Sequence, residues 1–271
     1  MSDHRYTRLL TIAGSDSGGG AGIQADLKTF SALGGYGMSV ITALTAQNTI
    51  GVLGVHAAPP QFIAQQLDAV LSDIGVDAVK IGMLASPDII ETVADRLRFY
   101  NAPSVVLDPV MVAKSGDKLL QDNAIEALRN TLLPLATVLT PNLPEASVLL
   151  SRHINTRHDM EKAAQDLQAL GAKHVLVKGG HLTAQGSADC LATADGTVYW
   201  FEEERIETTN THGTGCTLSS AIATFLARGE SIEDAVRKSK QYLTGAIRAG
   251  AAYRLGNGHG PVHHFYALWK F

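Results

Sequence analysis

Short apolar runs rich in valine, isoleucine and leucine recur along the chain and alternate with stretches of helical periodicity. Six runs predict strands buried on both faces: Leu9–Ala13, Ser39–Leu44, Val76–Ile81, Ser104–Leu107, Thr137–Thr140 and His174–Lys178. Helices are predicted where apolar residues recur every three or four positions, at residues 62–74, 89–97, 217–227 and 232–249. This alternation predicts an α/β fold, with a central, mainly parallel sheet flanked by helices on both faces in a single domain spanning residues 1–271.

Two segments depart from this alternation. An Asp195-Gly196 pair between two apolar runs predicts a β-hairpin over residues 189–201. The tail after Gly256 fits no element, and its histidines are expected to take no part in chemistry. They are His259, His263 and His264.

Composition excludes several classes of protein. Of the 271 residues, 45% are hydrophobic and 18% charged, which is enough apolar material for a core without disulfide or metal staples. The net charge of −4 lacks the basic excess of nucleic-acid binders, so no nucleic acid is expected as a partner. No apolar run approaches 18 residues, and the two cysteines match no metal-binding spacing, so we expect no membrane segment and a cytoplasmic location.

Polar residues and glycines follow each predicted strand. They are Gly14–Gly22, Gln47-Asn48, Gly82-Met83, Asp108–Val110, Pro141–Glu145 and Lys178–His181. In an open parallel sheet the ligand site forms at the carboxyl ends of the strands. We therefore expect these residues to gather at one edge of the sheet.

The chain has 26 glycines, and seven of them form two clusters. The first cluster, residues 14–22, precedes a predicted helix over residues 24–33. Its N–H groups either face a ligand in front of that helix or belong to a flexible surface loop. Ile23 replaces the last glycine of the dinucleotide fingerprint and no Gly-Lys pair exists, which disfavours Rossmann oxidoreductases and P-loop ATPases.

The second cluster, Thr211–Cys216, opens a predicted helix. The N–H groups of residues 213–216 would form an anion-binding nest at the positive end of the helix dipole. Cys216 is predicted to have a lowered thiol pKa there, unless it is only a small buried residue at a helix start. Its thiolate would then attack a carbonyl as a nucleophile or take a proton from a substrate hydroxyl.

An acidic set favours phosphoryl transfer. Asn142 and Glu145 lie three residues apart at a predicted helix start, and Asp108 ends another predicted strand. Their hard oxygen atoms suit Mg²⁺, although both carboxylates would also serve as helix-terminal or turn residues. Phosphoryl transfer needs such a set, and acyl transfer does not.

Together these motifs resemble the ribokinase-like kinases, and within them the hydroxymethylpyrimidine/phosphomethylpyrimidine kinases of thiamine biosynthesis. The resemblance spans nearly the whole chain, at residues 11–26, 79–84, 107–111, 140–145, 177–181 and 211–216. It implies a ribokinase-like fold, MgATP as phosphoryl donor and a small pyrimidine as substrate. The pyrimidine would be phosphorylated to its monophosphate and then to its pyrophosphate, and a homodimer is expected.

The resemblance also implies roles for individual residues. Cys216 is implied to be the base, where most ribokinase-like enzymes have an aspartate, and His212 either lies near the second phosphate or faces solvent. The other implied residues are Gly213, Thr214 and Gly215 in the anion hole, Gln47, Gly14, Asp26, Met83 and Val110 on the substrate, Lys178, Asn142 and Asp108 on ATP, and Glu145 with Asp108 at Mg²⁺ through water.

Three alternatives stay open. A pyridoxal/pyridoxine kinase is nearest, because both substrates are small hydroxymethyl heteroaromatics; Gln47 favours the pyrimidine. A cysteine acyl-transfer or hydrolytic enzyme would use Cys216 as its nucleophile and would need an oriented histidine base. A non-catalytic nucleotide-binding module is the third.

Overall fold

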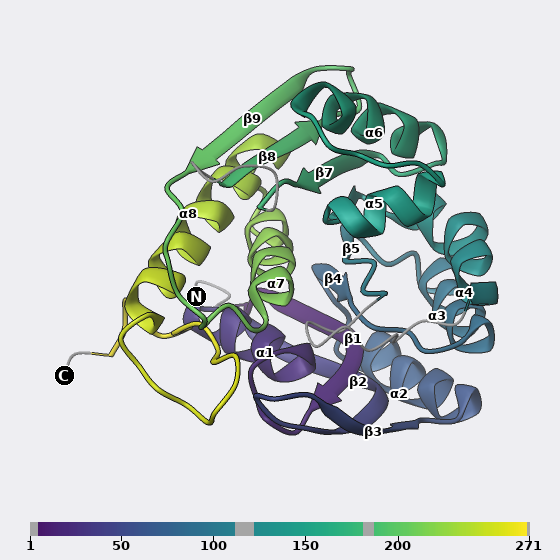
Figure 1. Cartoon of the computed structure of the whole chain (residues 1–271). Helices are drawn as coiled ribbons and strands as arrows, with labels where there is room; N and C mark the ends of the chain where they lie inside the picture. The colour runs from purple at the N-terminus through teal and green to yellow at the C-terminus, as the bar shows by residue number, and fades with distance from the viewer. Residues whose placement is uncertain (1–4, 112–121, 181–186, 270–271) are drawn as a thin grey trace.

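In the computed structural model, residues 5–111, 122–180 and 187–269 are described, and they form one sheet covered by helices (Figure 1). The strands lie in the order β3-β2-β1-β4-β5-β6-β7-β8-β9. Their bounds are β1 Arg8–Asp16, β2 Tyr36–Gln47, β3 Val52–Ala57, β4 Ala78–Ile81, β5 Val105–Leu107, β6 Val138–Leu139, β7 His174–Lys178, β8 Ser187–Ala192 and β9 Val198–Glu203.

The helices connect these strands. Their bounds are α1 Gly22–Ala32, α2 Pro60–Asp73, α3 Pro87–Phe99, α4 Asp122–Ala127, α5 Leu143–Leu150, α6 Arg157–Ala169, α7 Thr214–Ala227 and α8 Ile232–Gly250, with a π-helical turn η1 at Leu128–Leu132 and a 3₁₀ turn η2 at Leu133–Leu135. Among the helices described, none has the length and apolar character that crossing a membrane requires.

Strand pairing confirms the predicted parallel sheet. Strands β2, β1, β4, β5, β6 and β7 pair in parallel, while β3 and the β8–β9 hairpin are antiparallel additions at the two edges. The strand order turns back between β1 and β4, because β1 has β2 on one side and β4 on the other. Such a switch point opens a crevice at the carboxyl ends of the strands.

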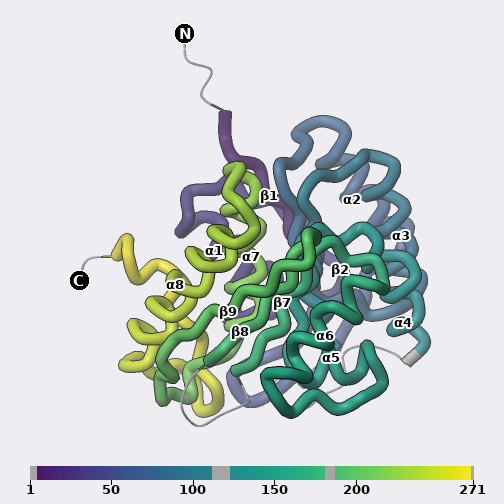
Figure 2. Tube along the Cα trace, turned by 90° about the horizontal axis from the view of Figure 1, so that it is seen from above, coloured from purple at the N-terminus to yellow at the C-terminus, as the bar shows by residue number. Residues whose placement is uncertain are grey.

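Alternate residues of each strand face two separate cores. Leu9 packs with Phe30 of α1 and Ile222 of α7, whereas Leu10 belongs to the cluster that holds Ile63 of α2. Figure 2 shows the result from above, with α1, α7 and α8 on one side of the sheet and α2 to α6 on the other. Burial on both faces explains why these strands are apolar throughout.

Two strands run further than their apolar pattern predicts. β1 continues three residues past Ala13 to Asp16, with an irregularity in its register between Ala13 and Gly14. β2 continues past Leu44 to Gln47 and pairs with β3, a strand that the sequence does not predict because its side chains are largely exposed. Both extensions carry polar residues into the crevice.

A buried ion pair joins the elements beneath that crevice. Lys80 of β4 lies 2.9 Å from Asp26 of α1, and both side chains are 0% exposed. Asp26 also accepts hydrogen bonds from Thr11 of β1 and Ser220 of α7, at 2.6 Å and 2.7 Å. Burial alone would lower the pKa of Lys80, but attraction to Asp26 and more weakly to Cys216 and Asp108 outweighs it and raises that pKa.

We predict that Lys80→Met destabilises the protein by about 3–5 kcal/mol, because it leaves the Asp26 carboxylate buried without a cation. Urea unfolding followed by circular dichroism measures this change. The matched control is Lys162→Met on α6, where Lys162 is 59% exposed and 3.5 Å from Asp166, and we expect a loss within about 1 kcal/mol. A loss for Lys80→Met as small as that of the control would contradict a structural role for the pair.

Candidate active site

The two glycine clusters meet at the switch point. Gly213, which precedes α7, has a φ of 78°, and a Cβ on it would overlap the carbonyl oxygen of Gly20. A Cβ on Gly20 would in turn overlap the ring of His212. Only glycines permit this approach, which brings the N-terminus of α7 against the loop before α1. Since Gly213 has no side chain, the first N–H groups of α7 have no cap from it.

Cys216 lies in the first turn of α7, between the N-termini of two helices. The N–H of Gly22, the first residue of α1, donates to its sulfur atom. Even so, loss of surrounding water raises the pKa of the Cys216 thiol to about 11; Asp26 and Asp108 raise it further, and Lys80 opposes them. The prediction of a lowered thiol pKa is therefore wrong for the protein without ligands, because desolvation exceeds the effect of the helix ends.

A second ion pair lies beside the start of α7. Lys178, at the end of β7, donates to Asp108 at 2.8 Å, and Thr140 and Ser219 also donate to this carboxylate. A Cβ on Gly215 would lie 3.3 Å from the Lys178 amine. Burial alone would raise the pKa of Asp108, but attraction to Lys178 and then Lys80 outweighs it and lowers that pKa. The Lys178 amine, the Asp108 carboxylate and the N-terminus of α7 therefore lie next to one another.

Asn142 and Glu145 form a reciprocal cap at the start of α5. The Asn142 side chain accepts from the Glu145 N–H at 2.9 Å, and the Glu145 carboxylate accepts from the Asn142 N–H at 2.8 Å. Burial raises the pKa of Glu145 to about 7; Lys178 opposes this shift and Asp108 adds to it. The helix-cap interpretation of this pair is therefore correct, and the same cap holds Glu145 within reach of the charges of Lys178 and Asp108.

The residues expected on the substrate side lie near the carboxyl ends of β1, β2, β4 and β5. A Cβ on Gly14 would lie 2.6 Å from the Met83 methyl group, so the two are in contact. The backbone N–H and C=O of Gln47 both bond to the Ser17 hydroxyl, at 2.8 Å each, which ties the end of β2 to the glycine loop. Val110 is partly buried, and its N–H donates to the carbonyl of Asp108.

Asp26 does not line this crevice with the others. Its side chain is 0% exposed and is occupied by Lys80, Thr11 and Ser220. A substrate therefore cannot touch it in this structure. Ser220 lies one helical turn after Cys216, so Asp26 supports the helix that carries the cysteine.

Asp16 and His212 are at the site although no role for Asp16 follows from the sequence pattern. The Asp16 carboxylate accepts from the N–H groups of Gly18, Gly20 and Ala21, at 2.8, 3.0 and 2.8 Å. These three N–H groups are thus not free for a ligand, contrary to one interpretation of the glycine run. The signal for Asp16 was its place at the start of that run, where a carboxylate can accept from several successive N–H groups.

Two histidines are more enclosed than expected. The His212 side chain is 15% exposed and does not face open solvent, and its Nε2 lies 3.0 Å from Asp16. His264, expected to be a tail residue without a role, is 4% exposed and its Nε2 lies 3.1 Å from the hydroxyl of Thr217 on α7. The tail therefore packs against α7. His181 lies outside the described residues.

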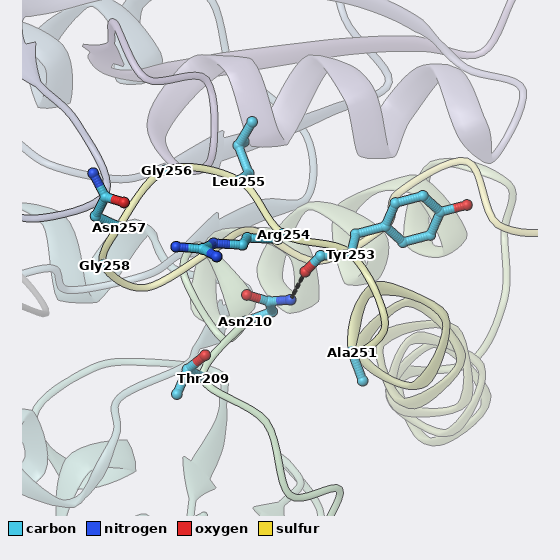
Figure 3. Close-up of a pocket in the computed structure, with 9 residues that line it drawn as sticks. All are labelled: Thr209, Asn210, Ala251, Tyr253, Arg254, Leu255, Gly256, Asn257 and Gly258. Atoms are coloured by element: carbon cyan, nitrogen blue, oxygen red, sulfur yellow. Dashed lines mark hydrogen bonds between the residues drawn. The ribbon is translucent and has the colours of Figure 1, made fainter.

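A separate cavity of about 280 Å³ lies beside the tail (Figure 3). It is lined by Thr209, Asn210, Ala251, Tyr253, Arg254, Leu255, Gly256, Asn257 and Gly258. Both amide hydrogens of Asn210 are used, by the carbonyls of Gly250 and Tyr253. None of the residues expected at the active site lines this cavity, and the start of α7, where several of them meet, is the better candidate.

A sequence profile of the phosphomethylpyrimidine kinase family matches residues 16–263. The chain belongs to this family. A hydroxymethylpyrimidine/phosphomethylpyrimidine kinase of Escherichia coli is 53% identical over 261 residues, which are 96% of this chain and 98% of that protein. The bifunctional thiamine biosynthesis protein ThiED of Geobacter sulfurreducens is 55% identical over 96% of this chain, which spans only 52% of that longer protein.

The fold of this family member is also that of a solved kinase. The ADP complex of Bacillus subtilis pyridoxal kinase superposes with a TM-score of 0.90 at 41% identity, covering 97% of this chain and 99% of the other. The resemblance to the ribokinase-like kinases of pyrimidine and vitamin metabolism, proposed from motifs alone, is therefore confirmed for family and fold.

We predict that iodoacetamide alkylates Cys216 slowly at pH 8 and that the rate keeps rising about tenfold per pH unit up to pH 9.5. The reason is the thiol pKa of about 11, since the thiolate is the reactive form. Mass spectrometry measures the rate, with circular dichroism confirming the fold at each pH. Cys190 is 0% exposed and should not be alkylated, so the Cys216→Ser control should show no modification. A plateau near pH 8 would contradict the raised pKa.

Proposed function

We propose that this chain transfers the γ-phosphoryl group of MgATP to 4-amino-5-hydroxymethyl-2-methylpyrimidine and then phosphorylates the monophosphate to the pyrophosphate. The observation that carries the proposal is the start of α7, where Gly213 to Cys216 lie between the substrate-side loop and the Lys178–Asp108 pair. A phosphoryl group moving between an alcohol and a nucleotide needs an anion nest with the acceptor on one side and cations on the other.

On the acceptor side, the Gln47 side chain would hydrogen-bond to the pyrimidine ring. Gly14, Met83 and Val110 would contact the ring and form the wall of its binding site. Cys216 would take the hydroxyl proton. With a pKa of about 11 the thiol is protonated at neutral pH, so it has to release its own proton to solvent first, and the thiolate then accepts the proton of the substrate hydroxyl. In a loose transition state the hydroxyl proton can be transferred late, because the incoming oxygen forms little bond before the phosphoryl group moves.

On the donor side, Lys178 would neutralise phosphate charge, and Asn142 and Glu145 would organise Mg²⁺. The two oxygens of Asp108 are already occupied by Lys178, Thr140 and Ser219. Glu145 uses only Oε2 in its cap, and no hydrogen bond to Oε1 is found within residues 5–111, 122–180 and 187–269. Of the two carboxylates, Glu145 is the better ligand, directly or through water. Bound Mg²⁺ supplies neutralisation of the developing phosphate charge.

The proposal includes a homodimer acting in the cytoplasm. Apolar side chains on β2 and β3 support a partner surface, since Leu44 is 53%, Leu53 81% and Val55 49% exposed.

Pyridoxal phosphorylation is the second candidate, favoured by the TM-score of 0.90 to a pyridoxal kinase. Acyl transfer by Cys216 is disfavoured by the environment of His212 and His264, because neither histidine contacts the thiol as a base would. Their Nε2 atoms face Asp16 and Thr217.

We predict that the protein, mixed with MgATP and the hydroxymethylpyrimidine, yields first the monophosphate and then the pyrophosphate. Both species are resolved by mass spectrometry of the reaction over time. A parallel reaction with pyridoxal tests the second candidate. A product with pyridoxal and none with the pyrimidine would reverse the assignment, and ATP binding without any product would favour a non-catalytic module.

We predict that Cys216→Ala lowers kcat by about 10²- to 10⁴-fold, the usual contribution of a general base. Cys216→Asp should retain more activity, because a carboxylate can also accept the hydroxyl proton. Single-turnover rates of phosphorylation measure both variants. A rate for Cys216→Ala close to that of the unaltered protein would exclude the base role and leave positioning as the source of catalysis.

A further inference from the structure

The ring of His212 lies between the glycine loop and the side chain expected to read the substrate. Its Nε2 is 3.0 Å from the Asp16 carboxylate and 3.3 Å from the Gln47 amide nitrogen. We propose that His212 is a specificity-determining residue, which fixes the orientation of the Gln47 carboxamide toward the pyrimidine by donating its Nε2 proton. This inference rests on the proposed function, in which Gln47 contacts the ring.

Asp16 decides the proton position on the ring. Three backbone N–H groups already donate to its carboxylate, and its side chain is only 3% exposed. Burial alone would raise the pKa of Asp16, but the hydrogen bonds from His212, Ala21 and Gly18 outweigh it and lower that pKa. An ionised carboxylate can only accept, so the His212 Nε2 facing it has to carry a hydrogen.

A hydrogen on Nε2 determines which end of the Gln47 amide faces it. Two donors cannot bond each other, so the amide nitrogen cannot be the partner at 3.3 Å. The oxygen and nitrogen of a glutamine amide are assigned from their hydrogen bonds, and rotation by 180° exchanges them. After that rotation, the one Nε2 hydrogen of His212 is shared in a three-centre hydrogen bond, with the Asp16 carboxylate as the nearer acceptor and Gln47 Oε1 as the second.

The hydroxyl of Thr45 supports the same rotation. It lies 2.9 Å from the carbonyl of Ser15 and 3.2 Å from the Gln47 amide oxygen, but it has one hydrogen for these two acceptors. With the amide rotated, Thr45 donates to Ser15 and accepts from the Gln47 nitrogen. Every donor in the cluster then faces an acceptor.

The ring of His212 is itself held in place. The backbone N–H of His212 donates to the carbonyl of Gly260 at 3.0 Å, and His212 forms an isolated parallel β-bridge with Pro261. The tail therefore holds the backbone of this residue in place. On the other side, Gly20 has no Cβ and the ring occupies that space. The donor is thus preorganised before a substrate enters.

A fixed amide discriminates between heterocycles. His212 and Thr45 leave the Gln47 amide one lone pair and one N–H for a ligand. The edge of a 4-aminopyrimidine offers an amino donor beside a ring-nitrogen acceptor, which pairs with such an amide in one orientation. A ring without the amino group leaves the amide oxygen unpaired, whereas an amide free to rotate would adapt to it.

The test measures binding, without ATP, of the hydroxymethylpyrimidine and of its analogue without the 4-amino group. Titration calorimetry gives the ratio of their Kd values. We expect His212→Met, which removes the donor at similar size, to reduce this discrimination about tenfold, and His212→Gln, which keeps an N–H at a similar reach, to retain it within about twofold. His158→Met on the exposed start of α6 controls for the change of residue type.

Combination with Gln47→Ala tests whether His212 acts through Gln47. In that background His212→Met should change the discrimination by less than twofold. An unchanged ratio for His212→Met alone, or an equal loss in both backgrounds, would overturn the inference.

If His212→Met does not fold, the ¹⁵N spectrum of the histidine rings in the unaltered protein decides, because an Nε2 of His212 without hydrogen is incompatible with the proposal. Failure of the unaltered protein to phosphorylate the pyrimidine would instead reject the proposed function, so the two failures are distinguishable.

Discussion

The close approach of Gly20 and Gly213 is the contact on which the site depends. Because neither residue has a Cβ, the loop before α1 and the start of α7 meet although they lie almost 200 residues apart. This contact places Cys216 against the N–H of Gly22 and the ring of His212 against Asp16. A side chain at either glycine would push the loop before α1 and the start of α7 apart.

Charge around this contact is balanced by buried pairs. Lys80 pairs with Asp26 beneath α7, and Lys178 pairs with Asp108 beside it. Each carboxylate sits where burial alone would favour its neutral form, and the neighbouring cation opposes that effect. At Asp108 the attraction to Lys178 and Lys80 outweighs burial and its pKa falls, whereas burial prevails at Asp26 and at the Cys216 thiol, and both of these pKa values are raised.

Much of the fold followed from periodicity. Strands of a parallel sheet are covered on both faces, so they read as continuous apolar runs, and all six predicted runs are strands. β3 was not predicted, because its side chains are exposed at the sheet edge and form no apolar run. α6 was not predicted because alanines at 163 and 164 weaken an apolar face that Met160 and Leu167 complete.

By itself the sequence determined the sheet, the polar residues and glycines at the carboxyl ends of its strands, the two glycine clusters and, through its motifs, the kinase family. Those features are local, since each depends on residue type and spacing along a short segment. Only the tertiary structure decided which charges meet, that Asp26 is enclosed, that His264 packs on α7 and that the Cys216 pKa is raised. Pairing and desolvation depend on contacts between residues distant in sequence, and no local pattern encodes them.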